Sequence, residues 1–157
     1  MATEIFVLSD RRLNSVAEWQ HAINSERFPF PLRLSADLSL ANLSGFLPAH
    51  YESAPSGFEC DQWDSRSIAD DYSDIVFGHP WKYALAFRFG IGHGELESAW
   101  MAATAYARST GGVIFDTEEG RIFQPDEAAQ LVRKIEQNRP LRAAIAEKFR
   151  QKIVPRS

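Results

Sequence analysis

Between residues 83 and 112 the sequence passes from a strand pattern to a helix pattern within a few residues, so the fold must contain both. Residues 83–89 alternate large apolar side chains with smaller or charged ones, as expected for a strand. Glycines at 90, 92 and 94 then interrupt the chain. Residues 95–108 are rich in alanine, with glutamates in the first turn and Arg108 in the last, which favours a helix. The pair Gly111–Gly112 predicts a left-handed end to that helix.

The rest of the chain carries weaker signals of the same two kinds. Ser15 and Glu18 have the spacing of a capping box, which predicts a helix start, and Pro125 predicts the start of another helix. Residues 54–57 predict a hairpin turn, Pro48 predicts an edge or a bulge, and 65–80 have the composition of a loop. We expect further strands near residues 4–8, 32–36, 45–53, 56–64, 113–115 and 121–123. A final helix is expected at 141–153. The alanine-rich helix should carry an apolar stripe formed by Leu96, Ala99, Trp100, Ala103 and Ala107.

This order of elements predicts an α+β fold, with a single mostly antiparallel sheet and helices packed on one of its faces. A chain of 157 residues has the length of one domain and buries enough surface to fold without a disulfide or a metal. We therefore expect a single domain over residues 1–157, in which 141–157 form either a peripheral basic helix or a tail.

Cysteine content and hydropathy indicate the cellular compartment. Cys60 is the single cysteine, so no disulfide forms within the chain, which is typical of a reducing compartment. The first ten residues lack the basic and apolar regions of a signal peptide, and no apolar run reaches the roughly 20 residues that span a membrane. We expect a cytoplasmic protein without membrane contact.

The charge of the chain is unevenly distributed. Residues 1–120 carry 8 basic and 17 acidic side chains, whereas 121–157 carry 9 basic and 4 acidic ones. The acidic body argues against binding to nucleic acid, because phosphates require a basic face. Glutamates interrupt the basic end and few aromatic residues accompany it, so we interpret it as a solvated helix face.

Motifs for catalysis or cofactor binding do not stand out. The glycines at 90–94 lack the spacing of a dinucleotide fingerprint and the Lys-Ser/Thr ending of a P-loop. The histidines at 21, 50, 79 and 93 have no metal-ligand spacing, and Asp116, Glu118 and Glu119 lack that of a calcium loop. Cys60 falls in a predicted strand, which favours a buried thiol. We expect no catalytic residue, no cofactor and no metal.

The segment from residue 59 to residue 74 combines acidic and aromatic side chains. Clustered carboxylates repel one another, so this segment is either a solvated edge or a surface that attracts a basic partner. In the second case the aromatic side chains serve as anchors. The candidate partner-binding residues are Glu59, Asp61, Trp63, Asp64, Asp70, Asp71, Tyr72 and Asp74.

Residues 83–130, with Gly111, Gly112 and Asp116 in a GGxxxD pattern after an alanine-rich helix, resemble small bacterial immunity proteins of polymorphic toxin systems. The resemblance implies a non-enzymatic inhibitor that binds and neutralises a cognate toxin. The acidic segment suggests that this toxin is basic. Two other functions stay open: a small-molecule-binding or catalytic domain with a pocket beside the turn at Gly90–Gly94 and His93, and an assembly subunit.

Overall fold

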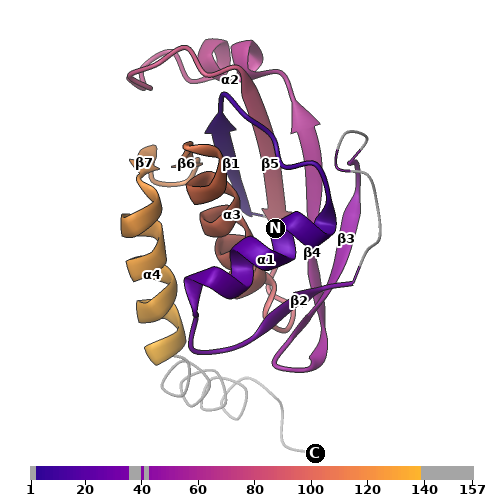
Figure 1. Cartoon of the computed structure of the whole chain (residues 1–157). Helices are drawn as coiled ribbons and strands as arrows, with labels where there is room; N and C mark the ends of the chain where they lie inside the picture. The colour runs from indigo at the N-terminus through magenta and orange to yellow at the C-terminus, as the bar shows by residue number, and fades with distance from the viewer. Residues whose placement is uncertain (1–2, 36–39, 41–42, 139–157) are drawn as a thin grey trace, which may run out of the picture.

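The computed structural model describes residues 3–35, 40 and 43–138. Its seven strands form one antiparallel sheet, and four helices accompany it, so the predicted α+β class is confirmed (Figure 1). The strand order is β2-β3-β4-β5-β1-β6-β7. The strands are β1 (Thr3–Ser9), β2 (Leu32–Leu34), β3 (Phe46–Tyr51), β4 (Ala54–Trp63), β5 (Tyr83–Phe89), β6 (Val113–Asp116) and β7 (Arg121–Phe123); the helices are α1 (Val16–Glu26), α2 (Ser65–Asp71), α3 (Glu95–Thr110) and α4 (Pro125–Gln137).

The helix ends follow the local sequence signals. The Ser15 hydroxyl accepts a hydrogen bond from the Glu18 amide at 3.1 Å and caps α1. Gly111 adopts a left-handed conformation, and its amide bonds back into the last turn of α3. At α4, Pro125 occupies the first turn while the Glu127 carboxylate accepts from the Gln124 amide at 2.9 Å. The predicted helix at 141–153 lies outside the described residues.

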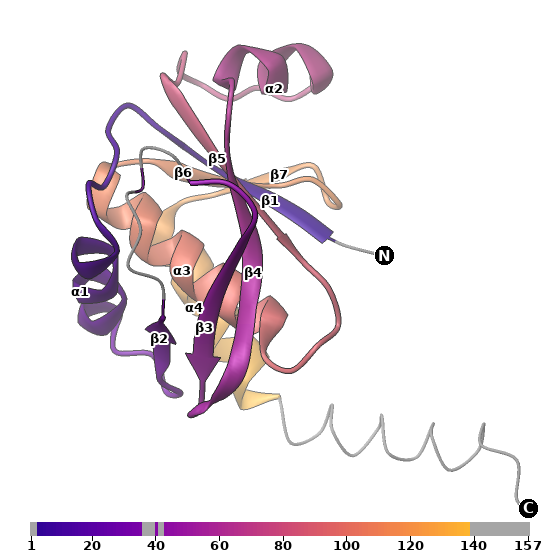
Figure 2. The same ribbon diagram turned by 90° about the vertical axis from the view of Figure 1, so that its right-hand side faces the viewer.

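Helices α1, α3 and α4 cover one face of the sheet, whereas α2 packs across an end of the opposite face (Figure 2). The expectation that all helices share one face therefore misses α2. The prediction of a loop at 65–80 is wrong for residues 65–71, because Asp64 caps a short helix there and Ile68 is buried beneath it. The opposite face has its own small core of Phe6, Leu8, Ile68, Ala84, Ala86, Val113 and Phe115.

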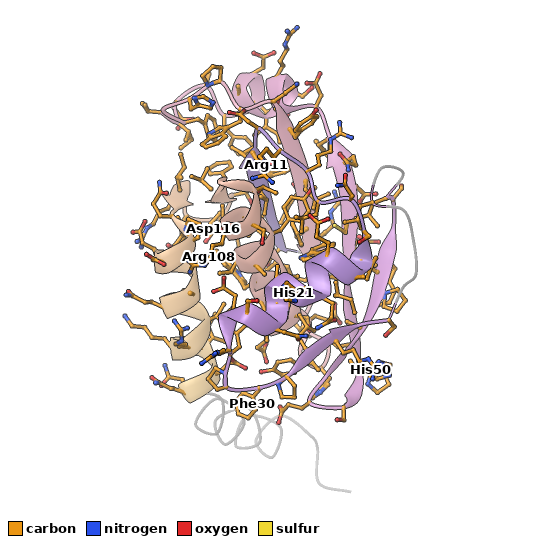
Figure 3. All side chains as sticks on the ribbon, viewed as in Figure 1. Arg11, His21, Phe30, His50, Arg108 and Asp116 are labelled. Atoms are coloured by element: carbon orange, nitrogen blue, oxygen red, sulfur yellow. The ribbon has the colours of Figure 1, made fainter. Side chains whose placement is uncertain are left out.

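The main core lies between the sheet and α3. Ala99, Ala102, Ala103, Ala105 and Ala107 are fully buried, well beyond the predicted stripe, because α1 and α4 also pack against α3. Arg108, labelled in Figure 3, joins these three helices by donating to Glu26 at 2.5 Å and to Asp126 at 2.7 Å. Alanine side chains allow this close approach on several sides of one helix.

The hairpin between β3 and β4 turns three residues earlier than predicted, at 51–54 instead of 54–57. Glu52 and Ser53 both adopt left-handed conformations, with φ of 53° and 65°, and Tyr51 pairs with Ala54. This is the geometry of a tight two-residue turn, formed without glycine or asparagine. Gly57 instead lies inside the sheet opposite Pro48. β3 is an interior strand, so the expected edge position of Pro48 is wrong. Pro48 lies one residue beyond the paired part of β2, and its carbonyl accepts a hydrogen bond from the Ser35 amide at 3.0 Å.

Glu136 is a buried carboxylate under the end of α4. Its Oε2 accepts a hydrogen bond from the Tyr51 hydroxyl at 2.8 Å, and the backbone of Phe30 also interacts with the carboxylate. Burial raises the pKa of Glu136, and the charge of Glu97 adds to this effect. The folded state therefore holds this proton more tightly than the unfolded state does.

The raised pKa of Glu136 predicts how the free energy of unfolding depends on pH. The raised pKa stabilises the folded state fully at pH values below the pKa of Glu136 in the unfolded chain. This stabilisation is lost as the pH rises through the raised pKa of Glu136 in the folded protein. The stability of wild type should therefore fall relative to that of Glu136→Gln as the pH rises from 4 to 8, because the variant has no carboxyl group to ionise. Urea unfolding followed by circular dichroism measures this. Glu18→Gln, on the exposed side of α1, is the control, and an equal gain in both variants contradicts the assignment.

Candidate functional site

The strand β4 places three of the predicted partner-binding residues on the same face of the sheet. Glu59, Asp61 and Trp63 alternate with Phe58 and Cys60, which are buried in the main core. The first three therefore lie on the face opposite α1, α3 and α4. Glu59 is exposed, and the Trp63 side chain is 39% exposed. We call this surface, with the neighbouring Glu4 and Arg88, the acidic sheet face.

Arg88 lies at the centre of the acidic sheet face. It is the cross-strand partner of Glu4 in β1 and of Glu59 in β4, and its guanidinium lies 2.9 Å and 3.8 Å from their carboxylates. The Glu4 hydrogen bond is the largest cause of the raised pKa of Arg88, and Glu59 and Asp61 contribute further. Two carboxylates thus flank one cation, and the Asp61 carboxylate lies on the same face, which leaves this face negative.

Glu4 is a site residue that the sequence does not reveal. It is far from residue 59 along the chain, and no local pattern links them. The sheet order places β1 beside β5 and β5 beside β4, so Glu4 and Glu59 flank the same arginine. The sequence signal was limited to an acidic residue at the start of a short strand.

Two of the predicted residues, Asp61 and Asp64, stabilise the fold around them. The Asp61 carboxylate accepts hydrogen bonds from the Ser44 hydroxyl at 3.0 Å and from the Gly45 amide at 2.9 Å. Asp64 accepts from the Arg66 amide at 3.0 Å and caps α2. Both carboxylates remain near the acidic sheet face, but their replacement would disturb local structure as well as charge.

The remaining predicted residues lie on α2 and just after it. Asp70, Asp71 and Asp74 are exposed. Tyr72 is half-buried, with its ring 4.9 Å from that of Phe115 in an edge-to-face contact. Burial is the main cause of the raised pKa of Tyr72, followed by the charges of Glu4 and Asp71. Tyr72 is therefore packed against the small core.

An exposed aromatic ring borders the acidic sheet face. Phe46 in β3 is 57% exposed and pairs with Glu59 across the strands. Its ring also lies over Gly57, where an added Cβ would come within 2.5 Å of the Phe46 Cζ. Phe46 was not among the candidate residues, although it lies in a predicted strand next to Leu47. With Trp63, it gives the acidic face two accessible aromatic side chains.

The turn at Gly90–Gly94 is occupied by the protein's own carboxylate. Glu95 accepts a hydrogen bond from the Gly90 amide at 3.0 Å, and its Oε2 lies against Gly92. The Ser56 hydroxyl donates to the His93 carbonyl at 2.7 Å and fixes the turn against β4. A bound anion would compete with Glu95 for this position, which favours a structural role for the glycines.

The described residues contain no group of three His, Cys, Asp or Glu side chains that fits a metal ion. His21 on α1 and His50 on β3 lie apart in Figure 3. Cys60 is buried, and burial, with the charge of Asp61, raises the pKa of its thiol well above the usual range. Such a thiol is protonated and unreactive in the folded state. None of the helices in the described ranges is both long and apolar enough to cross a membrane.

The fold and surface define an α+β protein with a single antiparallel sheet, helices packed mainly on one side, and a negative, aromatic-containing face on the other. Comparison of the chain with models of protein families, with curated proteins and with solved structures finds no match.

Proposed function

We propose that the protein is a non-enzymatic inhibitor of the immunity type, which binds a basic protein toxin through the acidic sheet face. The observation that carries this proposal is that Glu4 and Glu59 flank a single Arg88, and that Asp61 lies on the same face two residues further along β4. A surface of one charge sign accelerates association with a partner of the opposite sign. The resemblance of residues 83–130 to immunity proteins supports the same class of function.

The exposed aromatic side chains supply apolar contact area to this interface. Trp63 and Phe46 lie at the border of the acidic sheet face, and tryptophan is among the residues that most often dominate binding energy. Asp70, Asp71 and Asp74, the α2 acidic group, extend the negative field beyond the sheet. Tyr72 contributes through packing under this group.

The first test identifies the partner and its toxicity. Tagged protein is incubated with lysate of the source cells, eluted with a salt gradient, and the eluate is analysed by mass spectrometry. We expect a basic protein that elutes as the salt rises, because exposed charge pairs are screened. Expressed alone, this protein should arrest growth, and co-expression with the inhibitor should restore growth. A captured protein without toxicity contradicts the proposal.

Charge variants test the surface. Glu59→Gln should weaken partner binding about threefold, and Asp70→Asn/Asp71→Asn/Asp74→Asn about tenfold at low salt, mainly through slower association. Both should reduce the dependence of affinity on salt. Glu18→Gln removes one exposed charge from α1, on the helical side, and should leave binding unchanged. Surface plasmon resonance at several salt concentrations measures all three. Unchanged affinity in both folded test variants would exclude this surface.

A further inference from the structure

A cavity of about 520 Å³ lies between the end of β1, helix α2 and the segment 77–82. Helix α2, whose residues line the cavity, lies at the upper end of the sheet in Figure 1. Its volume falls in the range of pockets that hold small molecules. The apolar part of its lining consists of Leu8, Ile68, Ala69, Phe77, Pro80 and Trp81.

The single carboxylate that lines this cavity is already engaged. One Asp10 oxygen lies 2.6 Å from the His79 Nε2, and the other accepts a hydrogen bond from the Lys82 amide at 3.0 Å. The His79 hydrogen bond is the main cause of the lowered pKa of Asp10. Asp10 therefore fixes the 79–82 segment to the end of β1, and its acceptor sites serve that purpose.

The groups that remain available to a ligand are cationic or hydrogen-bond donors. Arg66 and Lys82 line the cavity, and neither side chain forms a salt bridge within the described ranges. The Trp81 Nε1 is buried and has no acceptor among the described residues. A buried donor without a partner costs about 1–3 kcal/mol. A ligand oxygen that reached this donor would remove that cost.

We propose that this cavity binds a small carboxylic acid with an apolar body, about the size of a one-ring aromatic acid. The body packs against Leu8, Phe77 and Trp81, and the carboxylate pairs with Arg66 and Lys82. A cationic ligand would meet these two side chains and an occupied Asp10, so it is disfavoured. An inorganic anion would leave the apolar lining without contacts. None of the proposed toxin-binding residues lines the cavity, although α2 carries both Arg66 and the exposed Asp70 and Asp71.

The test uses phenylacetate and follows the indole N–H signals of the full-length protein by ¹⁵N NMR. The four tryptophans give four such signals, and Trp81→Phe assigns the one from Trp81. With about ten non-hydrogen atoms, phenylacetate should bind with a Kd of about 1 mM or lower. We expect a saturable shift of the Trp81 signal, with binding about tenfold weaker for neutral phenylacetamide. Absence of a saturable shift, or an equal shift with inorganic phosphate, would overturn the proposal.

Variants of Arg66 and Lys82 test where the carboxylate of the ligand binds. Arg66→Gln and Lys82→Gln should each weaken phenylacetate binding about fivefold, because each removes one charged donor. Arg33→Gln, an exposed arginine on β2 that lines a different cavity, is the matched control and should bind as wild type does. Circular dichroism verifies that all three are folded. Equal weakening in the control, or none in Arg66→Gln and Lys82→Gln, would contradict this assignment.

Discussion

Replacing Trp19 with alanine should reduce the free energy of unfolding by about 3–5 kcal/mol, the usual loss for a large buried aromatic residue. Trp19 is fully buried, and its ring contacts those of Phe58, Phe87 and Tyr106 at centroid distances of 5.3–6.3 Å. Its Nε1 also donates a 2.9 Å hydrogen bond to the Ala102 carbonyl. This one side chain thereby connects α1, the sheet and α3.

Urea unfolding followed by circular dichroism at 222 nm measures this loss without depending on tryptophan fluorescence. Trp63→Ala is the control, because Trp63 is half-exposed and keeps one edge-to-face contact with Phe6. Trp63→Ala should reduce the free energy of unfolding by about 1 kcal/mol. If Trp19→Ala fails to fold, Trp19→Phe should still show a loss of about 1–2 kcal/mol from the missing hydrogen bond and volume. Equal stability of Trp19→Ala and Trp63→Ala would contradict the packing.

Gly57→Ala should destabilise the protein by about 2–3 kcal/mol, because glycine is required here for two separate reasons. Its φ of 143° is rarely adopted by other residues. An added Cβ would also lie 2.6 Å from the Leu47 carbonyl oxygen, in the backbone of the neighbouring strand, and 2.5 Å from the Phe46 ring. The ring can move, but the strand cannot shift without disturbing β3.

Gly45→Ala separates these two reasons. Gly45 has a φ of 90° and nothing within 4 Å of an added Cβ, so its substitution introduces backbone strain alone, about 1–2 kcal/mol. The double variant Phe46→Ala/Gly57→Ala removes the movable part of the clash and should remain less stable than Phe46→Ala. Thermal unfolding of the four proteins gives the comparison. A Gly57→Ala variant as stable as Gly45→Ala would show that β3 and β4 are not held this closely.

The elements that sequence patterns predicted well are those whose signals are local. The ends of α1, α3 and α4 depend on side chains within a few residues, such as Ser15 with Glu18 and the glycine at 111. The strand at Tyr83–Phe89 follows from alternation over seven residues. The hairpin turn was misplaced because Gly57 and Pro55 resemble turn residues, whereas the register of β3 and β4 puts the turn at Glu52 and Ser53.

The candidate site was predicted in part. Glu59, Asp61 and Trp63 share a face because strand residues alternate, which the sequence indicates once β4 is recognised. Their different roles were not predictable, since the Asp61 carboxylate binds Ser44 and Gly45, and Tyr72 packs on Phe115. These partners lie 16 to 43 residues away, and no local pattern encodes such contacts.

The sequence by itself determined the α+β class, the positions of the capped helices and the acidic character of the segment after residue 58. Local hydrogen bonds and side-chain periodicity are sufficient for these features. The tertiary structure alone decided that Glu4 and Glu59 flank Arg88, that α2 covers the other face of the sheet, and that Asp10, His79 and Trp81 meet beside one cavity. The physical reason is strand order: β1 pairs with β5 and β6, so residues distant in the chain become neighbours only when the whole sheet has formed.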